Sequence, residues 1–175
     1  MTQILYQKSG SLGISNNSHN LEVICEAMCK NEVDIRSFVE TNTHWKHEKS
    51  LPRLKQILNQ FWGRRKMSTS EIITPWKSIY ELGGSVIIYT SNIASTIIKL
   101  GEDEEELGCW SYVTYGGRNQ TKVTIISTYR PYVSNENEGV STTHSQQWDI
   151  LEERRQEHEN IREKLIKYLT TLIHS

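Results

Sequence analysis

The strongest strand signal in the chain is the run from Thr121 to Tyr129, in which β-branched residues follow one another. Such residues favour a pleated, buried surface, and Pro131 lacks the backbone donor that a continuing strand needs. We therefore predict a core strand that stops at Tyr129. A second predicted strand, Asp34 to Val39, ends in Glu40-Thr41-Asn42. Because ligands gather beyond the carboxyl ends of strands in open α/β sheets, we predict that both strand ends face one site.

Two segments in the first third of the chain have the apolar spacing of helices. The first is predicted to start after a cap at Asn20 and to end near Lys30-Asn31, and the second to run from His47 to Trp62. Ile4-Leu5-Tyr6 is predicted to be a short strand. The resulting order of strand, helix and strand predicts two parallel neighbours joined by a right-handed crossover.

Beyond Trp62 the apolar spacing changes to a period of two. It predicts an antiparallel meander whose strands are Glu71–Ile73, Gly83–Thr90, Ala94–Leu100, Cys109–Tyr115 and Thr121–Tyr129. From about Ser145 an apolar stripe that continues to Leu172 predicts one long amphipathic helix.

Two charged features do not fit this pattern directly. Arg36 lies in a predicted buried strand, so it requires either a wet face or a partner carboxylate. The acidic residues from Glu102 to Glu106 are consecutive, and we predict a solvated hairpin tip there and not a metal site.

Composition limits the classes of function. The chain has 175 residues, which is enough for one domain, and a net charge of −1, so no overall basic field indicates nucleic acid. Arg64-Arg65-Lys66 is typical of solvated surface, with a phosphate contact as the alternative. The odd number of cysteines favours free thiols in a reducing compartment. The first ten residues lack the apolar core of a signal peptide, and no apolar run has membrane length, so we predict an intracellular protein of the cytoplasm or nucleus.

Several motifs, in this order, resemble the endonuclease/exonuclease/phosphatase superfamily. VETNTHW at 39–45 is similar to the strand of that family that ends in its metal-binding glutamate. It is followed by GGSVIIY at 83–89, LGCWSYV at 107–113, STYRPY at 127–132 and SQQWDILEE at 145–153. The resemblance spans the chain and the first half of the family's domain. CEAMCKNEVDI at 25–35, together with ETNTHW and LGCWSYV, looks most like the endonuclease domains that precede a reverse transcriptase in retroelements.

The resemblance implies a fold and a chemistry. The fold is α/β (α+β): a two-sheet β-sandwich flanked by helices in four layers, α/β/β/α, incomplete here, with residues 1–175 as a single domain. The chemistry is metal-dependent hydrolysis of DNA phosphodiesters, in which Glu40 would hold Mg²⁺ or Mn²⁺ and Tyr129 would contact the scissile phosphate. Asn42, Lys8 and Arg130 are possible supporting residues. The expected partners are DNA and a C-terminal half or reverse transcriptase domain of the parent protein, with no membrane.

The chain also departs from the family. Lys8 stands where the family usually has an asparagine, and a cation there would repel a metal ion. The family's Asp-x-Asn strand end and final Asp-His pair are expected beyond Ser175, so this portion is predicted to be inactive alone. A degenerate interaction module without catalysis, and a phosphatase acting on small phosphoesters, are therefore the alternatives.

The residues themselves also allow simpler interpretations. Asn42 is typical of a turn residue, near enough to orient Glu40. His44 and His47 could imitate part of a zinc site near Glu40, but the loop setting and the missing fourth ligand argue against it.

Overall fold

The computed structural model describes residues 2–10, 12, 14, 18–72, 83–90, 92–129, 143–154 and 160–174. The chain divides into two compact units, Met1–Tyr129 and Arg130–Ser175, so the single domain over residues 1–175 stays a prediction. The first unit contains β1 (Ile4–Lys8), α1 (His19–Lys30), β2 (Ile35–Val39), α2 (Ser50–Phe61), β3 (Arg65–Ser70), β4 (Ser85–Thr90), η1 (Ile93–Thr96), β5 (Ile97–Glu102), β6 (Trp110–Gly116), η2 (Arg118–Gln120) and β7 (Lys122–Thr128). The second unit contains α3 (Thr143–Glu153) and α4 (Ile161–His174). No described helix is long and apolar enough to cross a membrane.

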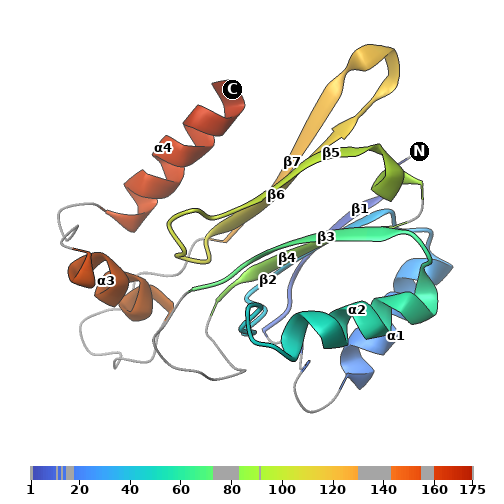
Figure 1. Ribbon diagram of the computed structural model, residues 1–175, viewed down its shortest axis with the longest axis horizontal. Coiled ribbons are helices and arrows are strands. Elements are labelled where there is room, and N and C mark those ends of the chain that lie inside the picture. Colours follow the sequence, from blue (N-terminus) through green and yellow to red (C-terminus); the bar gives the residue numbers. More distant parts are fainter. Residues whose placement is uncertain are drawn as a thin grey trace. The chain divides into compact units, whose positions relative to one another are not determined.

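The described strands form two sheets (Figure 1). The first has the order β1-β2-β4-β3 and the second the order β5-β6-β7. β1 and β2 are parallel, as predicted, and all other pairs are antiparallel. In the first unit α1 and α2 lie on one side of the first sheet and the second sheet lies on the other (Figure 1). The predicted two-sheet sandwich with flanking helices is thus confirmed, and a fourth helical layer stays a prediction.

Several predicted elements differ from the structure. The antiparallel meander is confirmed for β5, β6 and β7, but a single five-strand meander is wrong, because η1 leads the chain out of the first sheet after β4 and into the second at β5. The strand predicted at Glu71–Ile73 is wrong too: β3 precedes it, Ile72 makes only an isolated bridge with Leu107, and Ile73 lies outside the described residues. The predicted long helix is two helices, and Asn160 starts the second by accepting the backbone N–H of Arg162 at 2.9 Å.

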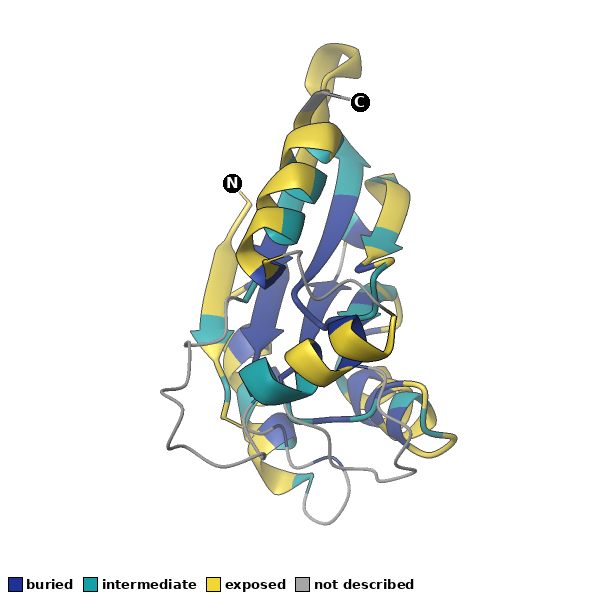
Figure 2. Ribbon diagram, turned by 90° about the vertical axis from the view of Figure 1, so that its left-hand side faces the viewer, coloured by how far each residue is buried: buried dark blue, intermediate teal, exposed yellow. Residues whose placement is uncertain are grey.

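The main core lies between the helices and the first sheet. Phe38 of β2 and Val86 and Ile88 of β4 point toward the helices because side chains alternate along a strand. Their contacts on the helices are the buried residues Leu21, Cys25, Met28, Leu54, Ile57 and Leu58. Each such aliphatic side chain contributes roughly 2 kcal/mol by leaving water. Figure 2 shows these strands in the dark blue of buried residues.

The space between the two sheets changes in character along the strands. An apolar cluster that includes Ile35, Ile87 and Val113 fills one part of it. Toward the carboxyl end of β2 the contacts are hydroxyl pairs instead: Ser37 with Ser127, and Ser85 with Ser111 at 3.0 Å. A buried hydroxyl without a partner is costly, so these pairs fix which strands face each other.

The two charged features are explained differently from the prediction. Arg36 is buried, contacts the side-chain amide oxygen of Gln7 and lies 4.8 Å from the centre of the Phe38 ring, so its neighbours are an amide and a ring, and burial lowers its pKa. Asp103 is 6% exposed, so the solvated acidic tip is wrong at this position. Its carboxylate accepts the backbone N–H groups of Glu105 at 3.1 Å and Cys109 at 2.9 Å.

Asp103 should make stability depend on pH. Burial raises the pKa of Asp103 to about 6, so between about pH 4 and pH 6 the folded chain holds a proton that the unfolded chain has released. The free energy of unfolding therefore falls as pH rises through this window, by up to roughly 3 kcal/mol. Urea unfolding is measured for the wild type and for Asp103→Asn across this pH window. The difference between their free energies of unfolding gives the contribution of Asp103 at each pH. A constant difference would contradict the assignment.

Candidate functional site

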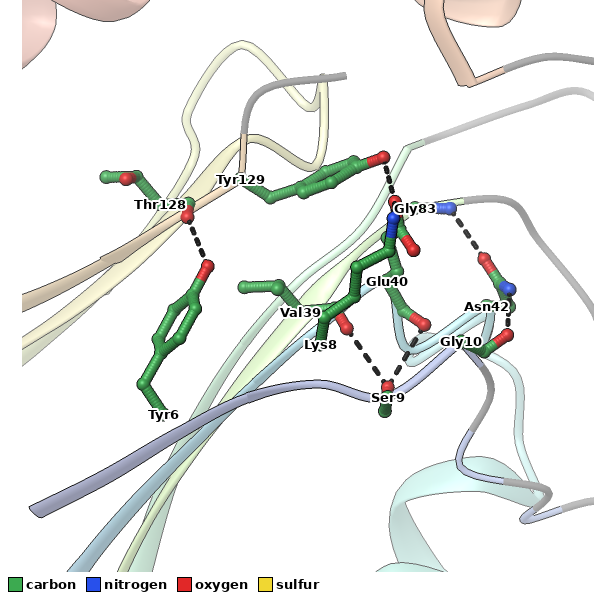
Figure 3. A network of polar contacts seen from close by, with 10 residues as sticks. All are labelled: Tyr6, Lys8, Ser9, Gly10, Val39, Glu40, Asn42, Gly83, Thr128 and Tyr129. Atoms are coloured by element: carbon green, nitrogen blue, oxygen red, sulfur yellow. Dashed lines mark hydrogen bonds and ion pairs between the residues drawn. The ribbon is translucent and has the colours of Figure 1, made fainter. Parts of the chain in front are cut away.

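The two predicted strand ends meet. Glu40 directly follows β2 and Tyr129 directly follows β7, and the Tyr129 phenol donates a hydrogen bond to Oε1 of Glu40 across 89 positions of sequence (Figure 3). Tyr129 has the same strand phase as Ser127, whose hydroxyl contacts Ser37 of the first sheet. Its backbone N–H bonds to the carbonyl of Cys109 at 2.7 Å, which holds the end of the strand in place. The structure thus brings Glu40 and Tyr129 together, and their catalytic roles stay predictions.

Lys8 is the third member of this contact. In the parallel register Lys8 of β1 lies opposite Val39 of β2. The ammonium of Lys8 lies 2.9 Å from the same Oε1 of Glu40. The Lys8 side chain is 68% exposed, whereas that of Glu40 is 16% exposed. Glu40 is therefore a partly buried carboxylate, and one of its oxygens contacts both a phenol and a surface ammonium.

The backbone that presents Glu40 is strained. Glu40 and Asn42 have φ values of 52° and 48°, a left-handed region that costs residues other than glycine about 1 kcal/mol or more. The Ser9 hydroxyl donates to the carbonyls of Val39 and Glu40, at 3.0 and 3.1 Å. The surrounding loops thus hold a conformation in which the strand ends abruptly and Glu40 turns toward β7.

Asn42 connects the loops on either side. Its amide nitrogen donates to the Gly10 carbonyl at 2.5 Å, and its amide oxygen accepts the N–H of Gly83 at 2.9 Å (Figure 3). Gly84, at φ +75°, comes so close that an added Cβ would lie 3.0 Å from both the Ser70 carbonyl and the Thr41 hydroxyl. Asn42 is therefore a cross-link between distant loops, where a local turn residue was predicted, and it positions Glu40 through the backbone.

Tyr6 and Ser9 were missed by the sequence analysis. The Tyr6 phenol donates to the Thr128 carbonyl at 3.1 Å and ties the edge of the first sheet to β7. Burial and the charge of Glu40 raise the pKa of Tyr6, which keeps this donor protonated. The sequence did hold a signal for both residues. Tyr6 lies in β1 and Ser9 directly follows it, and a strand parallel to β2 ends at the same edge of the sheet as Glu40.

His44 lies beside a buried carboxylate. His44 lies 3.9 Å from the buried carboxylate of Glu71, which also accepts the backbone N–H of Lys46 at 3.0 and 3.1 Å. Glu71 therefore stabilises the turn after β2. Arg130, the remaining predicted site residue, lies outside the described residues.

The described residues do not form a metal site by themselves. Among them, no group of three His, Cys, Asp or Glu side chains could hold a metal ion. Mg²⁺ and Mn²⁺ favour several oxygen ligands, whereas here one carboxylate oxygen already faces an ammonium. The phenol has a single proton, which it gives to Glu40, so it is not available to a phosphate in this arrangement.

Replacing Asn42 should loosen this loop cluster. Asn42→Ala removes both side-chain hydrogen bonds and leaves a less tolerant residue in the left-handed region, so we expect a loss of about 2–3 kcal/mol in the free energy of unfolding. Asn31→Ala is the matched control, since Asn31 makes one local side-chain bond, to Ala27 at 2.7 Å, and should cost less than about 1 kcal/mol. Equal losses in urea unfolding would contradict the cross-link.

Comparison with known proteins identifies the fold. No family model matches the chain, and a search of the curated proteins finds no match. Among solved structures, an endonuclease/exonuclease/phosphatase family protein from Leptotrichia buccalis C-1013-b is similar, with a TM-score of 0.50 and 11% identity. The alignment covers 88% of this chain and 61% of the length of that protein. The chain therefore has an endonuclease/exonuclease/phosphatase-like fold.

Proposed function

We propose that this chain is a portion of a metal-dependent phosphodiesterase domain that acts on DNA, of the kind carried by retroelements. The observation that supports it is the meeting of Glu40 and Tyr129, which come from different sheets. A carboxylate suits a hard ion such as Mg²⁺ or Mn²⁺, and a phenol suits a phosphate oxygen. The likeness in fold supports the phosphoesterase class, and the motifs from Cys25 to Ile35 and from Glu40 to Trp45 support the retroelement origin.

Each residue has a definite place in this proposal. Glu40 would contribute a ligand to the ion, which when bound would stabilise charge on the phosphate oxygens. Tyr129 would position the phosphate. Its phenol can donate a hydrogen bond to a phosphate oxygen when another group neutralises Glu40. Asn42 holds the loop that carries Glu40. Arg130, next to Tyr129, would add a phosphate contact.

The proposal includes inactivity of this portion alone. Hydrolysis requires a general base and a fuller ligand set, and among the described residues no group of three His, Cys, Asp or Glu side chains could hold the ion. The missing groups would come from further polypeptide, either a C-terminal half or a domain joined to a reverse transcriptase. A DNA substrate fits the expected location in the cytoplasm or nucleus.

Nicking of supercoiled plasmid DNA in Mg²⁺ tests this function. The 175-residue chain should show no nicking above background. Protein from the reading frame continued past Ser175 should nick the plasmid, about 100-fold more slowly with Glu40→Gln and about 10-fold more slowly with Tyr129→Phe. Equal rates for wild type and Glu40→Gln would contradict the role of Glu40. Hydrolysis of a small phosphoester in place of DNA would favour the phosphatase alternative.

An interaction module is the second candidate, and the exposure of β1 favours it. Ile4, Leu5 and Tyr6 are 55%, 39% and 56% exposed, and Figure 2 shows this strand in yellow beside the N-terminus. Among the described strands β1 pairs only with β2, so its other edge is open to a strand from a second chain.

Light scattering during size exclusion tests the second candidate. If β1 is an interface, the chain should self-associate as concentration rises, and Ile4→Glu should return it to a monomer. Val23→Glu is the control, because Val23 is a similarly exposed apolar residue, at 49%, on helix α1. A wild type that stays monomeric at every concentration would contradict this candidate.

A further inference from the structure

The ammonium of Lys8 lies beside Glu40, where a bound metal ion would otherwise lie. This ammonium lies 2.9 Å from Oε1 of Glu40, and the side chain reaches the carboxylate from the edge strand β1 (Figure 3). The resemblance implies an asparagine at this position, a neutral side chain whose amide oxygen can bind a metal ion, and this chain has lysine instead. The substitution replaces a potential metal ligand by a positive charge.

Glu40 is partly buried, and a positive charge stabilises its carboxylate there. The Glu40 side chain is 16% exposed, and a partly buried charge is stabilised when it is paired and hydrogen-bonded. Lys8 supplies the charge and Tyr129 a hydrogen bond, both at the same oxygen. Lys8 and Tyr129 therefore compensate the charge of Glu40, as a bound metal ion would.

The same geometry opposes a divalent ion. An ion bound by Glu40 would lie a few ångströms from the ammonium, and repulsion between these charges weakens affinity on the order of tenfold or more even at high dielectric. The Lys8 side chain is also 68% exposed, so N–H donors of its ammonium that do not face Glu40 can turn to an external anion.

We propose that Lys8 takes the place of the metal ion in this chain: its ammonium keeps divalent cations away from Glu40, and with Tyr129 it forms a metal-independent contact for a nucleic-acid phosphate. This inference rests on the proposed function for its ligand class, a nucleic-acid phosphate, and departs from it in one respect: in the 175-residue portion alone, Lys8 and not an ion compensates the charge of Glu40. Because Lys8 remains paired with Glu40, the Tyr129 phenol can turn its hydrogen bond from the carboxylate to a phosphate oxygen, and Glu40 keeps a partner.

Mn²⁺ binding, measured by the loss of the free-ion signal in electron paramagnetic resonance, tests the cation claim without any turnover. The wild type should bind Mn²⁺ at least about tenfold more weakly than Lys8→Asn and Lys8→Gln. Adding Glu40→Gln to Lys8→Asn should abolish the gain. Lys46→Asn is the matched control, because Lys46 pairs with Glu106 at 3.3 Å at the surface and its removal should leave Mn²⁺ binding unchanged.

The phosphate claim has its own readout. Fluorescence anisotropy of a labelled single-stranded oligonucleotide should give the same affinity in EDTA and in Mg²⁺ for the wild type, and a several-fold weaker affinity in EDTA for Lys8→Gln. Circular dichroism establishes that each variant is folded.

The outcomes separate the two proposals. If the wild type binds Mn²⁺ as tightly as Lys8→Asn, and Glu40→Gln removes that binding, the inference fails while the proposed metal role of Glu40 stands. If neither Lys8 variant gains Mn²⁺ affinity, the inference fails and the proposed function loses its metal position as well. Oligonucleotide binding that requires Mg²⁺ in the wild type would overturn the phosphate claim.

Discussion

Pairing of buried hydroxyl groups between the two sheets is the constraint on which the rest of the structure depends. Ser37 meets Ser127, and Ser85 meets Ser111, in a region where water could not satisfy an unpaired hydroxyl. A shift of either sheet by one residue would turn these groups away from their partners, at a cost of about 1–3 kcal/mol for each unsatisfied hydroxyl. The register is thereby fixed, and Tyr129, two residues beyond Ser127, reaches Glu40, three residues beyond Ser37.

A second constraint acts at the strand end itself. Glu40 can turn toward β7 only because its backbone adopts a left-handed conformation that the loops at Ser9 and Asn42 enforce. Strain of this kind persists where the surroundings over-determine the conformation, and it concentrates at functional sites. The carboxylate so placed is partly buried, and Lys8 compensates its charge from the exposed edge of β1. Backbone strain, burial and an ion pair are therefore linked at one side chain.

Much of this arrangement followed from local pattern in the sequence. The β-branched run before Tyr129 and the parallel pair of β1 and β2 were predictable, because each depends on short-range propensity and on the handedness of crossovers. β3 was not, since its sequence RKMSTS has one apolar residue and its strand conformation comes from pairing with β4. The break before α4 was hidden because the apolar spacing continues through it, whereas Asn160 starts a new helix.

The candidate site was predictable only in part. Glu40 and Tyr129 stood out as polar ends of apolar strands, but the cross-link by Asn42 and the Tyr6 contact to β7 depend on residues distant in sequence. Such contacts leave no periodic signal. Lys8 was recognised as a departure, and its direct ion pair with Glu40 gives that departure a physical meaning.

A double-mutant cycle between Glu40 and Tyr129 tests the central claim, that these side chains from different sheets contact each other. The free energy of unfolding is measured for the wild type, Glu40→Ala, Tyr129→Phe and the double variant. A charge-assisted hydrogen bond between them predicts a coupling energy of about 1–2 kcal/mol. Losses that add to within about 0.3 kcal/mol would contradict the contact and, with it, the convergence of the two strand ends.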